Sequence, residues 1–287
     1  MAAESTVIAA VQMSSQADVS ENLDRAEALI REGARRAARI ALLPENFAYF
    51  GDEAGKRAHA EDLSLDASEA SSAPPGPIAR RLADLAREVV IHVIAGGMPE
   101  RSADPARPYN TCAVFGPDGR LAAKYRKCHL FDVDLVERPY RESAATTPGD
   151  EAVAARLGDL QVGLSICYDL RFPELYRALS ALGAEVLVVP AAFTVTTGKD
   201  HWHVLLRARA IEAQAYVVAA AQWGKHPLGR QTYGKSCIID PWGEVVAQAS
   251  EGEGVITAAI DRAYLEQVRS NVPSLKHRRA GLTSSSR

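Results

Sequence analysis

Residues 161–179 read QVGLSICYDLRFPELYRAL, and this stretch contains a strand, a turn and the start of a helix. The run Gln161–Cys167 is short and apolar, as in a buried strand, and Pro173 opens a segment of helical period. A cysteine on such a turn is exposed at the sheet edge, where backbone N–H groups point at whatever it attacks. Cys167 is therefore a candidate nucleophile, and a buried structural cysteine is the alternative.

The rest of the chain repeats this alternation of short apolar runs and segments of helical period, which predicts a layered α/β fold. Further strands are expected at Thr6–Met13, Arg39–Leu43, Val89–Gly96, Glu185–Pro190 and Tyr216–Ala221. Helices are expected from Val19 through Ile30, at Pro77–Glu88 and at Asp200–Ala213. The Ser-, Ala- and Pro-rich stretch Glu61–Pro77 is expected to be a surface loop.

Two tight turns containing Pro and Gly indicate β-hairpins, one at Phe115–Leu121 and one at Ile239–Val245. Because each half of the chain contains one of them, two sheets stacked face to face, with helices on both outer faces, are expected. We expect residues 1–287 to form one domain, because large layered folds reach this length. The tail after Val272 lacks a packing pattern and is expected either to be free or to reach a second subunit.

Composition excludes several classes of protein. The chain has 287 residues, 47% hydrophobic and 24% charged, which is typical of a globular protein with a packed core. A net charge of -3 gives no field that attracts nucleic acid or anionic lipid. No apolar run reaches the roughly 18 residues of a membrane span, and the start lacks a basic leader, so a cytoplasmic location is expected.

The cysteines and histidines do not indicate a metal site. The four cysteines lie far apart without zinc-ligand spacing, so free thiols are expected. His201 and His203 flank Trp202 at the expected start of a helix, and no third ligand stands at a suitable spacing. They are interpreted as surface or interface residues.

A catalytic cysteine needs a base or a cation beside it, because a free thiol is mostly protonated at neutral pH. Glu45 directly follows the expected strand Arg39–Leu43, where burial favours proton transfer, although a surface or capping role is the alternative. Lys127 ends the second arm of the first hairpin and is expected to point inward, whereas Lys124 and Arg126 are expected to be solvated.

Three blocks of sequence together resemble the signatures of the nitrilase superfamily of carbon–nitrogen hydrolases. They are Pro44-Glu-Asn46, Tyr125-Arg-Lys-Cys-His-Leu-Phe-Asp-Val-Asp134 and Ile166-Cys-Tyr-Asp-Leu-Arg-Phe-Pro-Glu-Leu-Tyr176. The blocks occur in the order of the family, and the resemblance extends from Val7 to about Pro273. It implies a four-layer α-β-β-α sandwich that usually dimerises, so a homodimer is expected.

The resemblance also implies a Glu–Lys–Cys triad at Glu45, Lys127 and Cys167. A further glutamate of the family, which positions the substrate and the lysine, corresponds to Glu142. Family members often have a glycine turn after the second block, whereas this chain has residues 135–139 without glycine, so the loop carrying Glu142 is expected to differ.

The expected mechanism needs no metal or organic cofactor. Glu45 takes the thiol proton, Cys167 attacks the amide carbon, and Glu45 protonates the departing nitrogen, which leaves a thioester. The Lys127 ammonium and the backbone N–H of Tyr168 would hold the oxyanion, a contribution of about 2.7–4 kcal/mol per donor. Water activated by Glu45 then releases the acid.

Within the superfamily, residues 201–222 and the Asp240-Pro-Trp-Gly turn resemble the deaminated glutathione amidases and the neighbouring omega-amidases. Such carboxylate substrates call for a cation, and Arg171 is the candidate, unless it pairs with Asp169 or Glu174. Family placement suggests that Phe193, Thr194 and Tyr49 also line the pocket.

Other functions stay open at this point. A related hydrolase acting on N-carbamoyl amino acids or simple aliphatic amides would use the same triad. A non-catalytic interaction module with the same fold is another possibility, although no triad member is missing. A thiol redox enzyme would need a resolving cysteine, and none is close to Cys167 in sequence.

Overall fold

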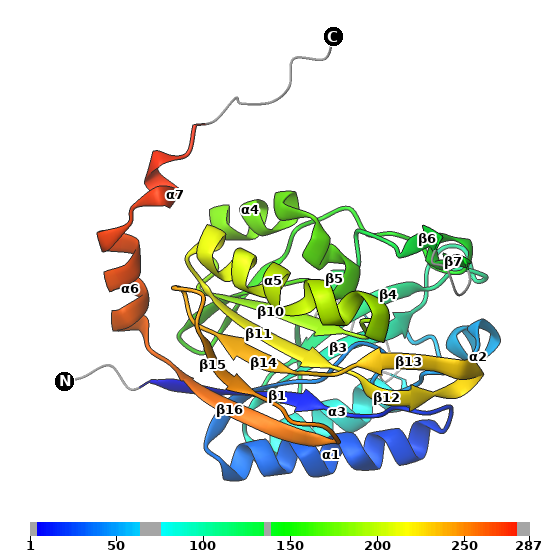
Figure 1. Cartoon of the computed structure of the whole chain (residues 1–287). Coiled ribbons are helices and arrows are strands. Elements are labelled where there is room, and N and C mark those ends of the chain that lie inside the picture. The colour runs from blue at the N-terminus through cyan, green and yellow to red at the C-terminus, as the bar shows by residue number, and fades with distance from the viewer. Residues whose placement is uncertain (1–4, 64–75, 135–138, 280–287) are drawn as a thin grey trace.

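The computed structural model describes residues 5–63, 76–134 and 139–279, and two six-stranded sheets lie face to face within them (Figure 1). The first sheet has the order β16-β1-β2-β3-β4-β5 and the second β15-β14-β11-β10-β9-β8. The strands of the first are β1 Thr6–Gln12, β2 Ala38–Leu42, β3 His92–Glu100, β4 Tyr109–Phe115, β5 Leu121–Arg126 and β16 Gly254–Ile260. Those of the second are β8 Ala154–Leu157, β9 Leu160–Leu164, β10 Val186–Ala191, β11 Tyr216–Ala221, β14 Cys237–Ile239 and β15 Val245–Gln248.

Alternation along the strands builds two apolar layers. In β1, Ile8 and Ala10 face the second sheet, whereas Ala9 and Val11 face the outer helices, because successive side chains of a strand point to opposite faces. The parallel pairs β1–β2–β3 and β9–β10–β11 form the centres of the sheets, and antiparallel strands flank them. Central strands covered on both faces are nearly continuous apolar runs, which is why the sequence reveals them.

Helices cover both outer faces of the stacked sheets (Figure 1). Helices α1 (Val19–Arg35) and α3 (Pro77–Val89) cover the first sheet, and α4 (Pro173–Ala181) and α5 (Val195–Ala213) cover the second. Asp18 caps α1 by accepting a hydrogen bond from the Glu21 N–H. The remaining helices are α2 Glu53–Ala58, α6 Arg262–Asn271 and α7 Ser274–His277, with 3-10 turns η1 Glu142–Ala144, η2 Cys167–Arg171 and η3 Pro227–Gly229.

Two small antiparallel ribbons complete the fold, β6 (Asp132–Asp134) with β7 (Pro139–Arg141) and β12 (Trp223–His226) with β13 (Arg230–Tyr233). The α-β-β-α sandwich and the two hairpins agree with the sequence predictions, since β4–β5 and β14–β15 lie one in each sheet. No described helix is long and apolar enough to cross a membrane.

Several local predictions were wrong, among them the solvated position of Lys124, whose ammonium pairs with the buried Glu100 carboxylate at 2.6 Å and whose side chain is only 18% exposed. Cys167 does not end a strand, because β9 ends at Leu164 and Cys167 begins a 3-10 turn. Helix α5 begins at Val195, so His201 and His203 lie inside it and not at its start.

Strand β3 begins only at His92, because α3 continues to Val89 and Val90 takes a left-handed conformation.

The stretch Glu61–Pro77 is not a surface loop at either described end. Glu61 is buried and accepts hydrogen bonds from the N–H groups of Ile78 and Ala79, so a carboxylate caps α3 from outside the helix. Pro77 begins α3, as expected for the helix Pro77–Glu88, and residues 64–75 lie outside the described residues. The described tail forms α7 and extends to Arg279, and a backbone carbonyl at Val272 accepts a hydrogen bond from Gln214.

The carboxyl ends of β2, β9 and β10 lead to one end of the sandwich. Glu45 follows β2, Cys167 follows β9 and Ala192 follows β10. The sheets approach closely here, since a Cβ added to Gly96 in β3 would lie 1.9 Å from the Leu43 carbonyl oxygen and 2.4 Å from Cβ of Pro190. The fold therefore brings loops from both sheets together at this end.

Candidate active site

A cavity of about 460 Å³ lies where these loops meet, and Glu45, Lys127, Glu142 and Cys167 all line it. The four residues come from four different elements. Glu45 follows β2 and Lys127 follows β5, while Glu142 begins η1 and Cys167 begins η2. The structure therefore brings together all four side chains that the sequence analysis selected for catalysis.

The Lys127 ammonium is the centre of this cluster. Its Nζ donates to Glu45 Oε1 at 2.9 Å and to the two carboxylate oxygens of Glu142 at 2.9 and 3.1 Å. The three side chains are only 2–5% exposed. A buried ammonium between two carboxylates is stable only because each charge is paired and hydrogen-bonded.

The ionisation of the cluster follows from this pairing. Burial alone would lower the pKa of Lys127, but the carboxylates of Glu142 and Glu45 outweigh it and hold that pKa well above its usual value. Burial would raise the pKa of Glu142, but Lys127 and Lys56 outweigh it and lower that pKa. The lysine is therefore a permanent cation and Glu142 a carboxylate.

Glu45 is held in place by donors from both sheets. Its Oε1 accepts a hydrogen bond from Asn110 Nδ2 at 2.9 Å, and its Oε2 accepts one from the Ala192 N–H at 3.2 Å. Its backbone carbonyl accepts a further bond from Gln222. The carboxylate of Glu45 is thus fixed in the cavity wall beside the cysteine.

Cys167 occupies a strained backbone position, with φ of 48° in the left-handed region that non-glycine residues rarely adopt. Burial, the nearby Glu45 carboxylate and hydrogen bonding with it raise the pKa of the Cys167 thiol well above its usual value, and Lys127 opposes this only in part. The resting sulfur is therefore a thiol, and it needs a base to become a nucleophile. The Glu45 carboxylate lies within hydrogen-bonding reach of this thiol.

Asp169 connects the cysteine turn to the segment that carries Lys127, and the sequence analysis did not assign it this role. Its completely buried carboxylate accepts hydrogen bonds from the Ile166 N–H at 2.8 Å, the Tyr125 hydroxyl at 2.7 Å and the His129 N–H at 3.0 Å. His129 Nδ1 also lies 2.7 Å from it. Tyr125 and His129 flank Lys127 in the second sequence block, which was the available signal.

The cavity wall contains most of the other selected residues. Tyr168, Arg171, Phe193 and Thr194 all line it, and Thr194 also caps α5 by accepting a hydrogen bond from the Thr197 N–H. Tyr168 lies in the first turn of η2, where N–H groups lack an acceptor within the helix. Arg171 does not pair with Asp169 or Glu174; its guanidinium contacts His201 Nδ1 at 3.1 Å.

Tyr49 is a correction, because it is not part of the cavity wall. Its ring packs beside His59 and its hydroxyl donates to Asp52. Lys56 and Arg230 line the cavity instead, and the sequence analysis missed both because they come from short elements without apolar period. The altered loop expected before Glu142 falls mainly on residues 135–138, which lie outside the described residues.

Metal ligands are not grouped in the described part of the chain, where no three His, Cys, Asp or Glu side chains are placed to hold an ion. All four cysteines, Cys112, Cys128, Cys167 and Cys237, are free thiols. Burial raises the pKa of Cys112 above its usual range and that of Cys237 to about 12, and both side chains are completely buried and do not line the cavity.

Comparison with known proteins identifies the family of this chain. The sequence model of the carbon–nitrogen hydrolase family matches residues 7–270. A deaminated glutathione amidase of Synechocystis is 45% identical over 94% of this chain and 97% of its own length. An omega-amidase of Xenopus tropicalis is 41% identical over 92% of each chain.

Solved structures show the same architecture. The NitFhit protein of C. elegans superposes with a TM-score of 0.88 at 37% identity, covering 99% of this chain and 67% of that protein. Nit3 of Saccharomyces cerevisiae, a member of branch 10 of the nitrilase superfamily, has a TM-score of 0.83 at 32% identity, covering 95% of this chain and 97% of Nit3. The chain described here belongs to the carbon–nitrogen hydrolase family, within the nitrilase superfamily.

Proposed function

We propose that this protein hydrolyses deaminated glutathione to 2-oxoglutarate and cysteinylglycine, with Cys167 as nucleophile. The observation that carries this proposal is the buried cluster in which the Lys127 ammonium contacts Glu45 and Glu142 in a cavity that Cys167 also lines. A base, a cation and a protonated thiol in one cavity are the groups that amide hydrolysis through a thioester requires.

The reaction proceeds in two steps. Glu45 removes the thiol proton while the sulfur attacks the amide carbon, and the oxyanion is stabilised by Lys127 and the Tyr168 N–H. Glu45 then protonates the nitrogen, the C–N bond breaks and the amine leaves. Water enters, gives a proton to Glu45 and attacks the thioester, and the acid departs as the thiol is restored. Glu142 holds Lys127 in place throughout.

Two observations support deaminated glutathione as the substrate. The first is the similarity to the amidases of that name, at 42–45% identity over almost the whole chain. The second is the charge of the cavity, where the cations Lys56, Lys127, Arg171 and Arg230 outnumber the carboxylates Glu45 and Glu142. Such an excess of positive charge suits a substrate with more than one carboxylate.

Omega-amidase activity on 2-oxoglutaramate is the second candidate, because relatives of that name are 38–41% identical to this chain. The two substrates share the same acyl half and differ in the amine that leaves. The same thioester would therefore form from either one, and only the space and charge offered to the leaving half would distinguish them.

The experiment that tests the function measures 2-oxoglutarate release from deaminated glutathione and from 2-oxoglutaramate. Ammonia release from N-carbamoyl amino acids and aliphatic amides is measured in parallel, with Cys167→Ala as control. We expect turnover of deaminated glutathione that disappears in the variant, and a thioester adduct on Cys167 by rapid-quench mass spectrometry. Turnover of only the carbamoyl compounds would refute the substrate, and no turnover together with uniform alkylation of all four thiols would favour a non-catalytic module.

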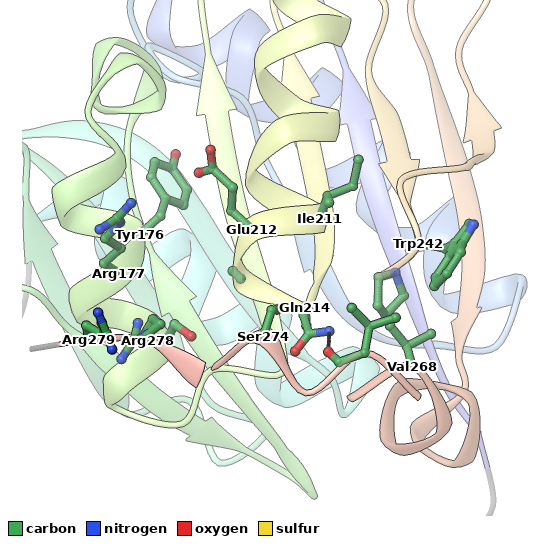
Figure 2. A pocket seen from close by; sticks show the side chains of 14 residues that line it. Tyr176, Arg177, Ile211, Glu212, Gln214, Trp242, Val268, Ser274, Arg278 and Arg279 are labelled. Carbon is green, nitrogen blue, oxygen red and sulfur yellow. Dashed lines mark hydrogen bonds between the residues drawn. The ribbon is translucent and has the colours of Figure 1, made fainter. Parts of the chain in front are cut away.

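A homodimer remains our prediction for the assembly, and exposed apolar side chains support it. Val204 and Ile211 lie seven residues apart on α5 and are 67% and 50% exposed, and Trp242 in the β14–β15 turn is 54% exposed. Figure 2 shows Ile211 and Trp242 at a second cavity, which α6 and the described tail also border. We expect light scattering to give twice the monomer mass and Trp242→Lys to reduce it.

A single domain, a cytoplasmic location and the absence of nucleic-acid and membrane partners likewise remain predictions. The net charge of -3 supports the last of these. Sedimentation with and without duplex DNA or anionic vesicles tests it, and co-sedimentation with either would refute it.

A further inference from the structure

Two cations of the cavity wall have no part in the mechanism above. Lys56 comes from α2 and Arg230 from β13, and both line the cavity that contains Cys167. Each side chain is only 15% exposed. Long cationic side chains are rarely buried to this extent without a partner. The position of these two cations therefore favours the binding of an anion in the cavity.

The carboxylates in contact with Lys56 and Arg230 carry less negative charge than the two side chains carry positive charge. Glu53 is the carboxylate they share among the described residues, 3.4 Å from Lys56 and 4.0 Å from Arg230. Glu142 also attracts Lys56, but it is already bound to the Lys127 ammonium. Asp52 also interacts electrostatically with Arg230, but its carboxylate accepts a hydrogen bond from the Gly55 N–H. Contact with Glu53 therefore leaves the two cations able to bind an anionic ligand.

Arg230 is held in place, and Lys56 stays charged. Arg230 donates to the Gly51 carbonyl at 2.6 Å, and its guanidinium lies 5.4 Å from the centre of the Phe50 ring. Burial would lower the pKa of Lys56, but Tyr140, Glu53 and Glu142 outweigh it and the pKa is raised, so the ammonium stays charged. Because Arg230 is already held in place, it binds a carboxylate at a lower cost in side-chain entropy than a mobile arginine would.

Arg171 belongs to a different part of the wall. It comes from η2, contacts His201 on α5 and lies 5.3 Å from the centre of the Phe193 ring, and none of these residues touches Lys56 or Arg230. Its contact with His201 is exposed to solvent, whereas Lys56 and Arg230 are mostly buried. The cavity thus offers two separate sites for anions, one exposed and one enclosed.

We infer that Lys56 and Arg230 bind the carboxylate of the acyl half of the substrate, while Arg171 binds the carboxylate of the leaving half. This inference rests on the proposed function, whose substrate has one carboxylate on each side of the scissile amide. The acyl half must stay bound as the thioester while the amine departs, so it belongs at the enclosed site. The amine must reach solvent, so it belongs beside Arg171, whose contact with His201 is exposed to solvent.

Substrates with one or two carboxylates separate the two sites. In Lys56→Met, kcat/KM is expected to fall about 10- to 100-fold for both deaminated glutathione and 2-oxoglutaramate, because both lose a charge-assisted contact. In Arg171→Met, it is expected to fall by a similar factor for deaminated glutathione alone. Pentanamide has the same number of carbons as 2-oxoglutaramate and no carboxylate, so its kcat/KM should fall much less than that of the carboxylate substrates in both variants.

Matched variants exclude a structural explanation. Lys225→Met removes an exposed lysine outside the cavity wall and should leave all three activities unchanged. Lys56→Arg keeps the charge and should restore part of the lost kcat/KM. If Lys56→Met slowed pentanamide as much as 2-oxoglutaramate, Lys56 would serve only to position Glu142, and the inference would be overturned.

A binding measurement gives a second, independent readout. In the Cys167→Ala protein, 2-oxoglutarate should bind with an affinity that Lys56→Met or Arg230→Lys lowers about tenfold or more and Arg171→Met leaves unchanged. The reverse pattern would overturn the assignment of the two sites. A protein that hydrolyses none of the carboxylate substrates would instead refute the proposed function.

Discussion

The residues around the cavity fall into two groups that are held in different ways. The floor consists of Glu45, Lys127, Glu142 and Cys167, which lie at ends of strands or in turns of both sheets and bind one another or buried backbone. The cationic wall consists of Lys56, Arg171 and Arg230, which come from α2, η2 and β13. The floor residues are held by one another and by buried backbone, whereas the wall residues project from elements around them. On the proposals above, the floor would carry out the chemistry and the wall would select the substrate.

The largest expected effect comes from the floor. Glu45→Gln keeps the size of the side chain but removes the base, so kcat/KM should fall about 10²- to 10⁴-fold for every amide, charged or uncharged. The Lys56 and Arg171 variants described above should act mainly on charged substrates. The same steady-state assays compare them, and an effect of Glu45→Gln limited to charged substrates would remove the distinction between floor and wall.

A substitution of Asp169 tests whether the positions of the floor residues depend on the hydrogen bonds of this buried carboxylate. Asp169→Asn replaces an acceptor of several buried hydrogen bonds by a side chain with two donor hydrogens, so the free energy of unfolding should fall by about 2–3 kcal/mol. Because the turn of Cys167 then moves relative to Lys127, kcat should fall about 10- to 100-fold with little change in KM. Urea unfolding and steady-state kinetics measure both quantities.

The control for this variant is Asp200→Asn, on the exposed face of α5. It should change neither stability nor kcat. If Asp169→Asn lowered stability but left kcat unchanged, Asp169 would support the fold without positioning the catalytic groups.

The pH dependence of the free energy of unfolding tests whether the charge of Glu142 in the floor stabilises the folded protein. The pKa of Glu142 is lower in the folded protein than its usual value of 4.5, so its contribution to stability is complete above about pH 4.5 and is lost as the pH falls through the folded pKa. Below about pH 4.5, the free energy of unfolding should therefore fall more steeply in the wild type than in Glu142→Gln. Urea unfolding at a series of pH values measures the slopes.

An exposed carboxylate provides the comparison. Glu266→Gln on α6 removes the same charge from a side chain that is 69% exposed, and the slope should remain that of the wild type. Equal slopes in the wild type and Glu142→Gln would show that Glu142 does not stabilise the folded state through its charge.

The fold and two residues of the floor were predictable from strands, whereas Glu142 was selected through the family resemblance alone. Buried parallel strands are continuous apolar runs, and residues that follow their carboxyl ends meet at one edge, which is why Glu45 and Cys167 were found. Asp169 was not recognised because its partners Tyr125 and His129 lie 40 or more residues away, and a lone aspartate near a helix is typical of a cap.

The cationic wall was only partly predictable. Arg171 follows the nucleophile closely in sequence, but Lys56 and Arg230 lie 174 residues apart, and nothing in either local pattern indicates that they meet. Tyr49 was selected by family placement, and its hydroxyl instead contacts Asp52 beside α2. Residues that act through short elements depend on tertiary contacts that periodicity does not encode.

The smallest expected effect concerns the spacing within the floor. A Cβ added to Gly97 would lie 2.8 Å from Asn110 Oδ1 and 3.1 Å from Glu45 Cγ, so Gly97→Ala displaces the contact that orients Glu45. We expect kcat to fall about 3- to 10-fold for all amides, with a loss of stability of about 1 kcal/mol. Gly254→Ala in β16 is the matched control, because a Cβ there meets no atom of the described residues within 4 Å. The displaced group belongs to the floor. If kcat fell only for carboxylate substrates, Glu45 would also take part in substrate recognition, and the proposed division between catalytic floor and substrate-selecting wall would be wrong.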